Sequence, residues 1–205
     1  HAHTVPMVWS QGELTLKAGT IQNFTGGNPS IGDAYLRITG VNAVYIEGTN
    51  SASSFIMRGG TIKRNATTGS SYGGAGVKLA GENALMAMDG GTITENSAQR
   101  SDASDGVMGG GVLMFNGGTL TMNGGTVSNN VAGSRGFDQG AMGGGIAGIG
   151  LGFRANMVLN GGTVEGNRAL SAVGGHGGGV FMHTHATFVA NGGSVLDNET
   201  TGMGG

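Results

Sequence analysis

One seven-residue pattern recurs along this chain at nearly constant spacing. The pattern Gly-Gly-Thr-(Ile/Val)-x-x-Asn begins at Gly59, Gly90, Gly124 and Gly161, and a variant with Ser in place of Thr begins at Gly192. Successive copies are 31, 34, 37 and 31 residues apart. A repeat of this length is typical of one supersecondary unit stacked on copies of itself. The spacing therefore predicts a solenoid.

The composition is consistent with an ordered repeat protein. Of 205 residues, 46 are glycine, about three times the usual share. These glycines sit at repeat positions and 38% of the residues are hydrophobic, which favours a folded chain over a low-complexity one. The net charge of −2 gives no electrostatic basis for binding nucleic acid or an anionic membrane. No apolar run is long enough to span a bilayer, and the absence of cysteine excludes disulfides and Cys-based metal sites.

Between the copies lies a second block, in which several glycines precede a β-branched residue. This residue is Val77, Val112, Ile146 or Val180, and Val44 extends the series toward the N-terminus. Short segments with strict alternation follow each block, which is typical of half-buried strands. Their expected inward pairs are Phe55/Met57, Met86/Met88, Leu120/Met122, Met157/Leu159 and Phe188/Ala190. With the Thr-(Ile/Val) segment, each period holds three short strands, and the fold class predicted is an all-β parallel β-helix of about six coils of roughly 34 residues.

Stacked coils place equivalent residues in columns. One column is expected in the interior: Ile21, Ile62, Ile93, Val127, Val164 and Val195. Another is expected at a turn: Asn65, Asn96, Asn130, Asn167 and Asn198. Asn tolerates the left-handed conformation, and stacked amides can hydrogen bond along a column. We interpret the Asn column as a structural ladder, with a polar binding track as the alternative.

The repeat extends over the whole chain and predicts a single domain, residues 1–205. Residues 1–32 form a degenerate first coil, and residues 33–205 form the regular coils. Neither end shows the polar cap that solenoids need, so we expect either a longer solenoid or end-to-end stacking of copies. Several apolar residues at outward positions predict further contacts along the sides: Ile56, Leu113, Val158, Phe181 and Val189.

The Gly-Gly-Gly-Val and Gly-Gly-Thr-Ile-x-x-Asn blocks resemble the right-handed parallel β-helix repeats of bacterial secreted and surface proteins. They are similar to blocks of adhesin-like proteins and of polymorphic outer-membrane protein passengers, and the broader fold is that of pectate lyases. Ile or Val stands here where the family's Phe-x-x-Asn has Phe. The resemblance covers residues 33–205 closely and 1–32 loosely. It implies an extracellular, elongated protein used for display or attachment.

Enzymes of this fold carry acids on outward positions of neighbouring coils, so these positions decide whether catalysis is expected. The outward residues of the first strand are Lys78, Leu113, Ala147 and Phe181, and none of them is acidic. The fourth position of the second strand has a single Asp in the column Arg58, Asp89, Asn123, Asn160 and Asn191, which is no acid pair. Asp102, Asp105 and Asp138 lie in predicted loops. We predict no catalytic residues and no cofactor.

Histidine and threonine patterns offer two further kinds of site. His183 and His185 alternate and would share a face if they lay on a strand, with His176 nearby, but we expect a polar turn there and no metal site. His1 and His3 would chelate a metal only if His1 were a free N-terminus. The outward column Thr61, Thr92, Thr126, Thr163 and Ser194 lacks the second threonine rank that ice-binding solenoids use. Three Asn residues lie in glycosylation sequons: Asn23, Asn65 and Asn198.

From these patterns we expect a non-enzymatic extracellular or cell-surface protein, structural or adhesive, within a filament or surface fibre. Recognition is expected in the segments that vary between coils: 66–72, 97–108, 131–142 and 168–176. The expected partners are further copies of the chain or glycans and proteins of a host or surface. The alternative is a carbohydrate-binding β-helix or a polysaccharide lyase or hydrolase.

Overall fold

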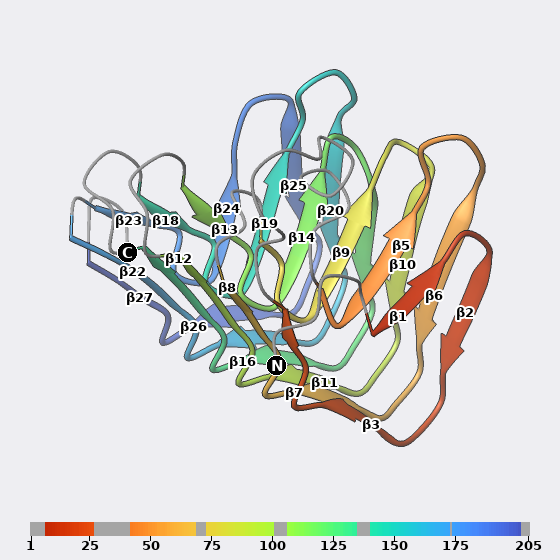
Figure 1. The fold of residues 1–205 in the computed structure, drawn as a ribbon, viewed down its shortest axis with the longest axis horizontal. Coiled ribbons are helices and arrows are strands. Elements are labelled where there is room, and N and C mark those ends of the chain that lie inside the picture. Colours follow the sequence, from red (N-terminus) through yellow and green to blue (C-terminus); the bar gives the residue numbers. More distant parts are fainter. Residues whose placement is uncertain are drawn as a thin grey trace.

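The computed structural model describes residues 7–26, 42–68, 73–100, 106–134, 140–172 and 174–201. Within these ranges the chain forms a parallel β-solenoid without helices (Figure 1). Every strand pair is parallel, and each pair joins one coil to the next. The predicted fold class, an all-β parallel β-helix, is confirmed.

Two six-stranded sheets, B and C, both contribute inward residues to the main core. Sheet B consists of β1 (Val8–Ser10), β5 (Val44–Glu47), β9 (Val77–Ala80), β14 (Val112–Phe115), β19 (Ile146–Ile149) and β24 (Val180–Met182). Sheet C consists of β2 (Glu13–Leu16), β6 (Ser53–Met57), β10 (Ala84–Met88), β15 (Thr119–Met122), β20 (Ala155–Leu159) and β25 (Ala186–Ala190).

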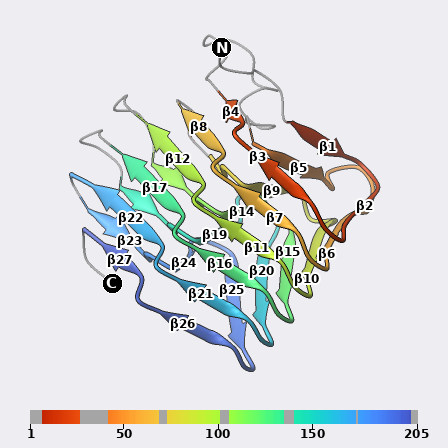
Figure 2. The ribbon, with the colours of Figure 1, turned by 90° about the horizontal axis from the view of Figure 1, so that it is seen from below.

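The other sheets complete each coil, and Figure 2 shows the first two of them from below. Sheet D consists of β3 (Thr20–Gln22), β7 (Thr61–Lys63), β11 (Thr92–Thr94), β16 (Thr126–Ser128), β21 (Thr163–Glu165) and β26 (Ser194–Leu196). Sheet A consists of β4 (Thr25–Gly26), β8 (Ala66–Thr68), β12 (Ser97–Arg100), β17 (Val131–Ser134), β22 (Arg168–Ser171) and β27 (Glu199–Thr200). The short sheet E consists of β13 (Val107–Met108), β18 (Ala141–Met142) and β23 (Gly175–His176).

The registers confirm that residues one period apart lie over one another. Ile93 pairs with Ile62 on one side and with Val127 on the other, and Val164 follows in the same column. These four side chains are fully buried. They pack with inward residues of sheets B and C, such as Met88, into one continuous core. Methionine is frequent in this core, where its flexible side chain fills irregular space.

The coil has four main strands rather than the three predicted. The additional strand belongs to sheet A and follows each ladder Asn, in segments expected to be loops. Its inward residues are small, namely Ala98, Ala132 and Ala169, and they pack against Val107 and Ala141 of sheet E. Such small side chains give little hydrophobic signal in a sequence, so the alternation was missed.

The number of turns is also slightly lower than expected. The structure has about five turns of roughly 34 residues, against the six coils predicted. Each of the four main sheets has six strands. Six stacked strands are separated by five turns of the chain, so the two counts agree.

Close approach of successive coils accounts for the glycine pairs. At Gly91 the backbone has a φ of 85°, and a Cβ atom there would lie 2.8 Å from the carbonyl oxygens of Gly59 and Gly60. Both the conformation and the space therefore require glycine. The same arrangement returns one coil later at Gly125, whose Cβ would meet the Gly91 oxygen at 2.8 Å.

The predicted Asn ladder runs through the corner between sheets D and A. The Nδ2 of Asn65 donates to Oδ1 of Asn96 at 2.9 Å, and the same bond links Asn96 to Asn130 at 2.9 Å, Asn130 to Asn167 at 3.0 Å and Asn167 to Asn198 at 2.9 Å. The first four of these side chains are fully buried. Each Nδ2 also donates to a sheet D carbonyl of the preceding coil, as from Asn130 to Ile93 at 3.0 Å. Buried amides are thus satisfied within the ladder.

The left-handed residue of this corner is not the ladder Asn, as we expected, but the residue before it. Arg64, Glu95, Asn129 and Asp197 have φ angles of 54°, 56°, 54° and 52°. Gly166 takes this position in the fifth coil with φ 61°. The left-handed residue bends the chain and turns its own side chain outward, which lets the following Asn point into the core.

We predict that removing a buried ladder amide costs far more stability than removing an exposed one. Asn130→Ala deletes four side-chain hydrogen bonds and leaves the Asn96 donors without an acceptor. The free energy of unfolding should fall by about 2–4 kcal/mol.

The matched control is Asn160→Ala. Asn160 makes the same kind of amide bond, to Asn123 and from Asn191, each at 2.9 Å, but on the exposed surface. Its loss should cost less than about 1 kcal/mol. Urea denaturation of both variants measures the difference, and equal losses would contradict a stabilising role of the buried ladder.

Candidate functional site

The outer face of sheet B differs from an ordinary outer face of a solenoid because most of its central residues are buried. Its outward column is Trp9, Tyr45, Lys78, Leu113, Ala147 and Phe181. We expected Leu113 and Phe181 to be free for contacts along the sides. Instead Leu113 and Ala147 are fully buried and Phe181 is half-buried. At β14 and β19, sheet B therefore has buried apolar residues on both of its faces.

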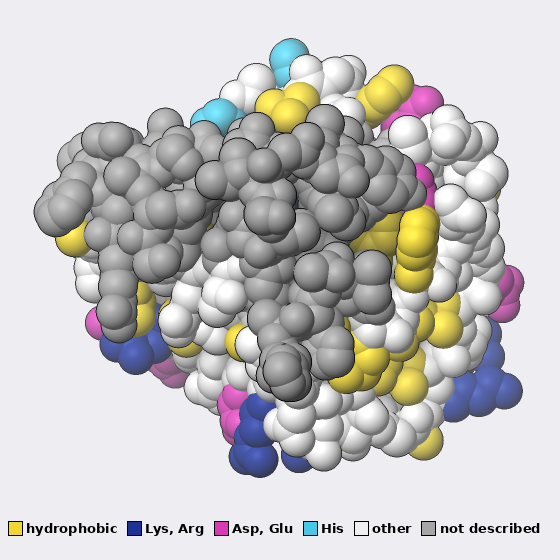
Figure 3. Space-filling model, in the orientation of Figure 1, with side chains coloured by type: hydrophobic (Ala, Val, Ile, Leu, Met, Phe, Trp, Pro, Cys, Tyr) yellow, Lys and Arg dark blue, Asp and Glu magenta, His cyan; other side chains and the backbone are white. Residues whose placement is uncertain are grey.

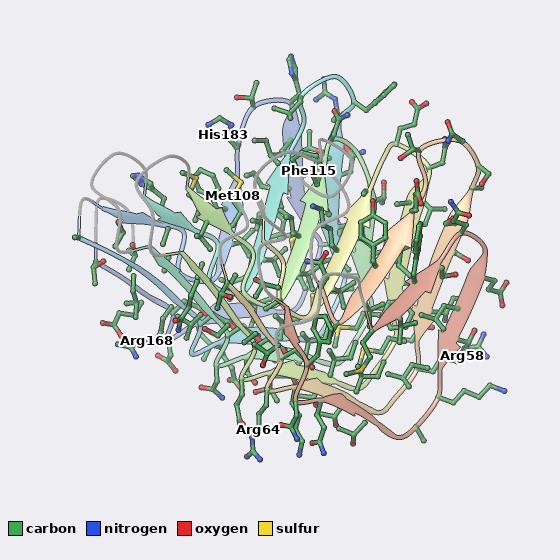
Figure 4. The ribbon with its side chains drawn as sticks, in the orientation of Figure 1. Arg58, Arg64, Met108, Phe115, Arg168 and His183 are labelled. Atoms are coloured by element: carbon green, nitrogen blue, oxygen red, sulfur yellow. The ribbon has the colours of Figure 1, made fainter. Side chains whose placement is uncertain are left out.

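Part of this second core is supplied by sheet E. Met108 and Met142 pack on Leu113, Phe115 and Ile149 in a cluster separate from the main core. Figure 4 labels Met108 near β13 and Phe115 near β14. A run of three glycines connects each sheet E strand to the sheet B strand that follows it, as Gly109, Gly110 and Gly111 do between β13 and β14. The outward apolar residues thus serve packing, and the prediction that Leu113 makes external contacts is wrong.

Lys78 is the one charged residue within this buried column. Its side chain is fully buried between Tyr45 and Leu113 of the neighbouring strands, and its Nζ lies 4.7 Å from the centre of the Phe115 ring. Burial lowers the pKa of Lys78 from 10.5 to about 7, because the protonated form loses its hydration. An ammonium over an aromatic face is stabilised by the ring quadrupole, which acts in the opposite direction.

The amine of Lys78 is enclosed by the protein and is not accessible from solvent. A lysine that is partly neutral near pH 7 can act as a nucleophile or base, but the Lys78 side chain has no exposed surface through which a substrate could reach it. The sequence predicts Lys78 only as an outward residue of the first strand. The alternating pattern gives no signal of its burial, because lysine at an outward position is ordinarily exposed.

Outward polar columns line the other faces. At the corner between sheets C and D, Asn123 donates to Asp89 at 2.8 Å and Asn160 donates to Asn123 at 2.9 Å, which forms an exposed amide column. On sheet D, the threonines Thr61, Thr92 and Thr126 lie in register as expected. Figure 3 shows basic side chains along the lower margin of the molecule, and Figure 4 shows Arg58, Arg64 and Arg168 pointing away from it.

His183 and His185 lie in a turn, as predicted. Strand β24 ends at Met182 and β25 begins at Ala186, so His183 and His185 share no strand face. His185 has a φ of 51°, and Nδ1 of His183 lies 2.9 Å from the Thr184 hydroxyl. The rings of His176 and His183 lie 6.0 and 5.8 Å from that of Phe181. They pack on an aromatic ring rather than converge on one point.

Several sequence-based candidates lie outside the described residues, namely Asp102, Asp105, Asp138, His1 and His3. Over the ranges that the structure describes, no group of three or more His, Cys, Asp or Glu side chains could hold a metal ion. The described parts of the variable segments are largely strands of sheets A and E.

The three glycosylation sequons differ in accessibility. The Asn65 amide is fully buried and bonded within the ladder, so the folded protein cannot present it to a transferase. Asn198 is half-buried in the same ladder. Asn23 is exposed.

A turn between sheets B and C carries exposed apolar residues that the repeat pattern does not reveal. Leu151 and Phe153 are 56% and 45% exposed, at a position where the other coils have mainly polar or glycine residues. Oδ1 of Asn116 accepts the backbone N–H groups of Leu151, Gly152 and Phe153 at 3.2, 2.7 and 3.2 Å. The turn is thereby held by the preceding coil.

The coil formed by β24–β27 has a second apolar surface. A shallow hollow there is lined by Val180, Met182, Phe188, Val195 and Leu196, with Asn198 at one side. Phe188 and Val195 occupy positions that are buried in the preceding coils, yet they are 40% and 46% exposed.

Comparisons of the chain with protein-family models, with curated proteins and with solved structures gave no match. In the described ranges there is no helix with the length and hydrophobicity needed to cross a bilayer. The site must therefore be interpreted from its own geometry.

We predict that Lys78 makes stability rise with pH. Between about pH 7 and pH 10.5 the unfolded chain binds a proton at this residue that the folded protein does not, so the free energy of unfolding increases with pH across this window. From pH 7 to pH 9 the gain should be roughly 2 kcal/mol.

The control is Lys78→Met, which keeps an unbranched apolar side chain and removes the titrating group. Urea denaturation at both pH values should show this contribution in the wild type and not in the variant. An unchanged pH dependence in Lys78→Met would contradict the assignment.

Proposed function

We propose that this chain is a non-enzymatic structural and adhesive element of the cell surface or extracellular space, within a filament or surface fibre. In this proposal a stiff solenoid holds variable segments at fixed positions. The observation that carries it is the buried Asn ladder, which bonds coil to coil from Asn65 to Asn198 alongside the backbone pairing of four sheets.

Stiffness is supported by the way each coil is fixed to its neighbours. In a solenoid a coil contacts only the coils on either side, so resistance to bending depends on each of these interfaces. Each interface between the coil of Asn65 and the coil of Asn198 includes backbone pairing on four faces, a shared apolar core and a hydrogen bond between ladder side chains. Such a rod suits a load-bearing or spacing role.

Display is supported by where the variable segments are attached. They connect sheet A to sheet E in successive coils, for example between β12 and β13 and between β17 and β18. These two sheets lie at the left of Figure 1, so β12 and β17 end, and β13 and β18 begin, at the same edge of the solenoid. Recognition is commonly carried by loops held on a rigid scaffold, and we assign adhesion to this edge.

A second candidate is binding or cleavage of a carbohydrate. The exposed amides of Asn123, Asn160 and Asn191 present donors and acceptors at regular spacing, which suits the hydroxyl groups of a polysaccharide. Asp102 and Asp105 would supply the acids for cleavage. The adhesive proposal is preferred because the repeated columns of the described solenoid have structural roles in its core and its Asn ladder.

We predict that binding depends on a variable segment and not on the solenoid surface. Replacing residues 101–105 by Gly-Ser-Gly-Ser-Gly should abolish binding to at least one glycan or glycoprotein on an array that the wild type binds, with the melting temperature changed by less than about 2 °C. The control Asn160→Ser alters the exposed amide column and should keep this binding.

A reducing-sugar assay on polyuronates and neutral polysaccharides separates the two candidates. The adhesive proposal predicts no product. Turnover that Asp102→Asn or Asp105→Asn removes would overturn it in favour of the enzyme.

A further inference from the structure

The outer face of sheet D carries two opposite charges, one near each end of an outward column. Lys63 on β7 and Glu165 on β21 share this column, and both side chains are half-buried. Neither side chain makes an ion pair with any residue that the structure describes. Neighbouring strands are about 4.8 Å apart, so three steps separate the two charges by roughly 14 Å, which exceeds the screening length in ordinary salt. Both charges are therefore available to a group outside the chain.

The surface between these charges consists of short hydroxyl side chains. Figure 2 shows strands β7, β11, β16 and β21 side by side in sheet D. Threonine and serine hydroxyls each offer a donor and an acceptor, and their short side chains let a second flat surface approach closely. Apart from Lys63 and Glu165, the outward residues of these strands are Thr61, Thr92, Thr94, Thr126, Ser128 and Thr163.

This face is complementary to itself when the solenoid direction is reversed. A twofold axis parallel to the strands, placed between β11 and β16, brings β7 opposite β21 of a second copy and β11 opposite β16. Lys63 then meets Glu165 of the second copy, and the symmetry repeats this contact, so one interface contains two ion pairs. The other opposed positions pair hydroxyl residues: Thr61 with Thr163, Thr92 with Thr126 and Thr94 with Ser128.

The charges select this register over its neighbours. With β7 opposite β16, Lys63 would meet Ser128, and with β7 opposite β26 it would meet Leu196. Two copies that run in the same direction would set Lys63 against Thr61. Each of these arrangements covers an ammonium group without an opposite charge, which is unfavourable. Only the antiparallel register with β7 opposite β21 pairs Lys63 with Glu165.

The residues at the corners beside sheet D are compatible with the same register. At the corner with sheet A, Arg64 would lie opposite Gly166, which has no side chain, and Glu95 would lie opposite Asn129. At the corner with sheet C, Arg58 would lie opposite an amide of the exposed Asn column. No like charges are brought together, and like charges in an interface would oppose association.

The size of the face limits the strength of one such contact. Three residues along each strand and four coils give a face of roughly 10 Å by 19 Å. A stable interface buries about 800 Å² on each partner. A pair of isolated chains should therefore associate weakly, and the contact gains strength where several copies repeat it along a fibre.

We propose that the outer face of sheet D between Lys63 and Glu165 binds the same face of a second copy of this chain in antiparallel orientation. This inference rests on the proposed structural function and specifies how two rods associate side by side. The face lies apart from the segments between sheets A and E to which adhesion is assigned, so each can be tested without the other.

The test exchanges the two charges. Lys63→Glu brings carboxylates together in the interface, and Glu165→Lys brings ammonium groups together. In sedimentation velocity at high protein concentration and low ionic strength, each variant alone should associate at least roughly tenfold more weakly than the wild type. An equimolar mixture of the two variants should recover association, because each introduced charge then meets an opposite one. The double variant should recover it alone.

Glu82→Lys is the matched control, because it makes the same charge change at an exposed residue in the turn between β9 and β10. Its association should equal that of the wild type. Should a charge exchange prevent a cooperative thermal transition, Lys63→Gln replaces it, and association should then weaken and lose its dependence on salt.

Three results would overturn the inference. They are a wild type that stays monomeric up to its solubility limit, a mixture that associates no better than its components, and a loss of association in Lys63→Glu but not in Glu165→Lys. The last result would assign Lys63 to an anionic ligand in place of a second copy. Glycan binding through residues 101–105 is measured on separate variants, so failure here leaves the adhesive proposal standing, and the reverse also holds.

Discussion

Every property of this molecule depends on the parallel pairing of residues one period apart. That pairing sets Ile93 over Ile62 and Asn96 over Asn65. Once it is fixed, apolar residues form a continuous core and a single amide position becomes a ladder. A side chain in such a column has the same neighbours in each coil, so one stabilising contact is repeated along the rod.

The same pairing explains why polarity is tolerated in the interior. An isolated buried amide would be costly, but each ladder Asn finds its donors and acceptor in the coils on either side. The ladder therefore adds side-chain hydrogen bonds between coils to the contacts of the apolar core. It also gives the solenoid a direction, because donors point one way along the column.

The sequence was sufficient for the columns but not for all of their surroundings. Strict spacing predicted the interior column of Ile93, Val127 and Val164 and the Asn ladder, because large apolar residues and a repeated Asn give strong signals. Sheet A was missed because Ala98 and Ala132 are too small to mark a strand. The burial of Leu113 and Lys78 was missed because it depends on packing over the outer face of sheet B, which an alternating pattern does not show.

The central claim is that residues one period apart are direct neighbours, and cross-linking tests it most directly. The chain has no cysteine, so Thr92→Cys with Thr126→Cys gives one pair of outward thiols on adjacent strands of sheet D. A short bifunctional thiol reagent should link this pair in the native protein within minutes and leave Thr92→Cys with Thr163→Cys, two coils apart, unlinked. Equal linking of both pairs, or linking of neither, would contradict the stacked coils on which the account rests.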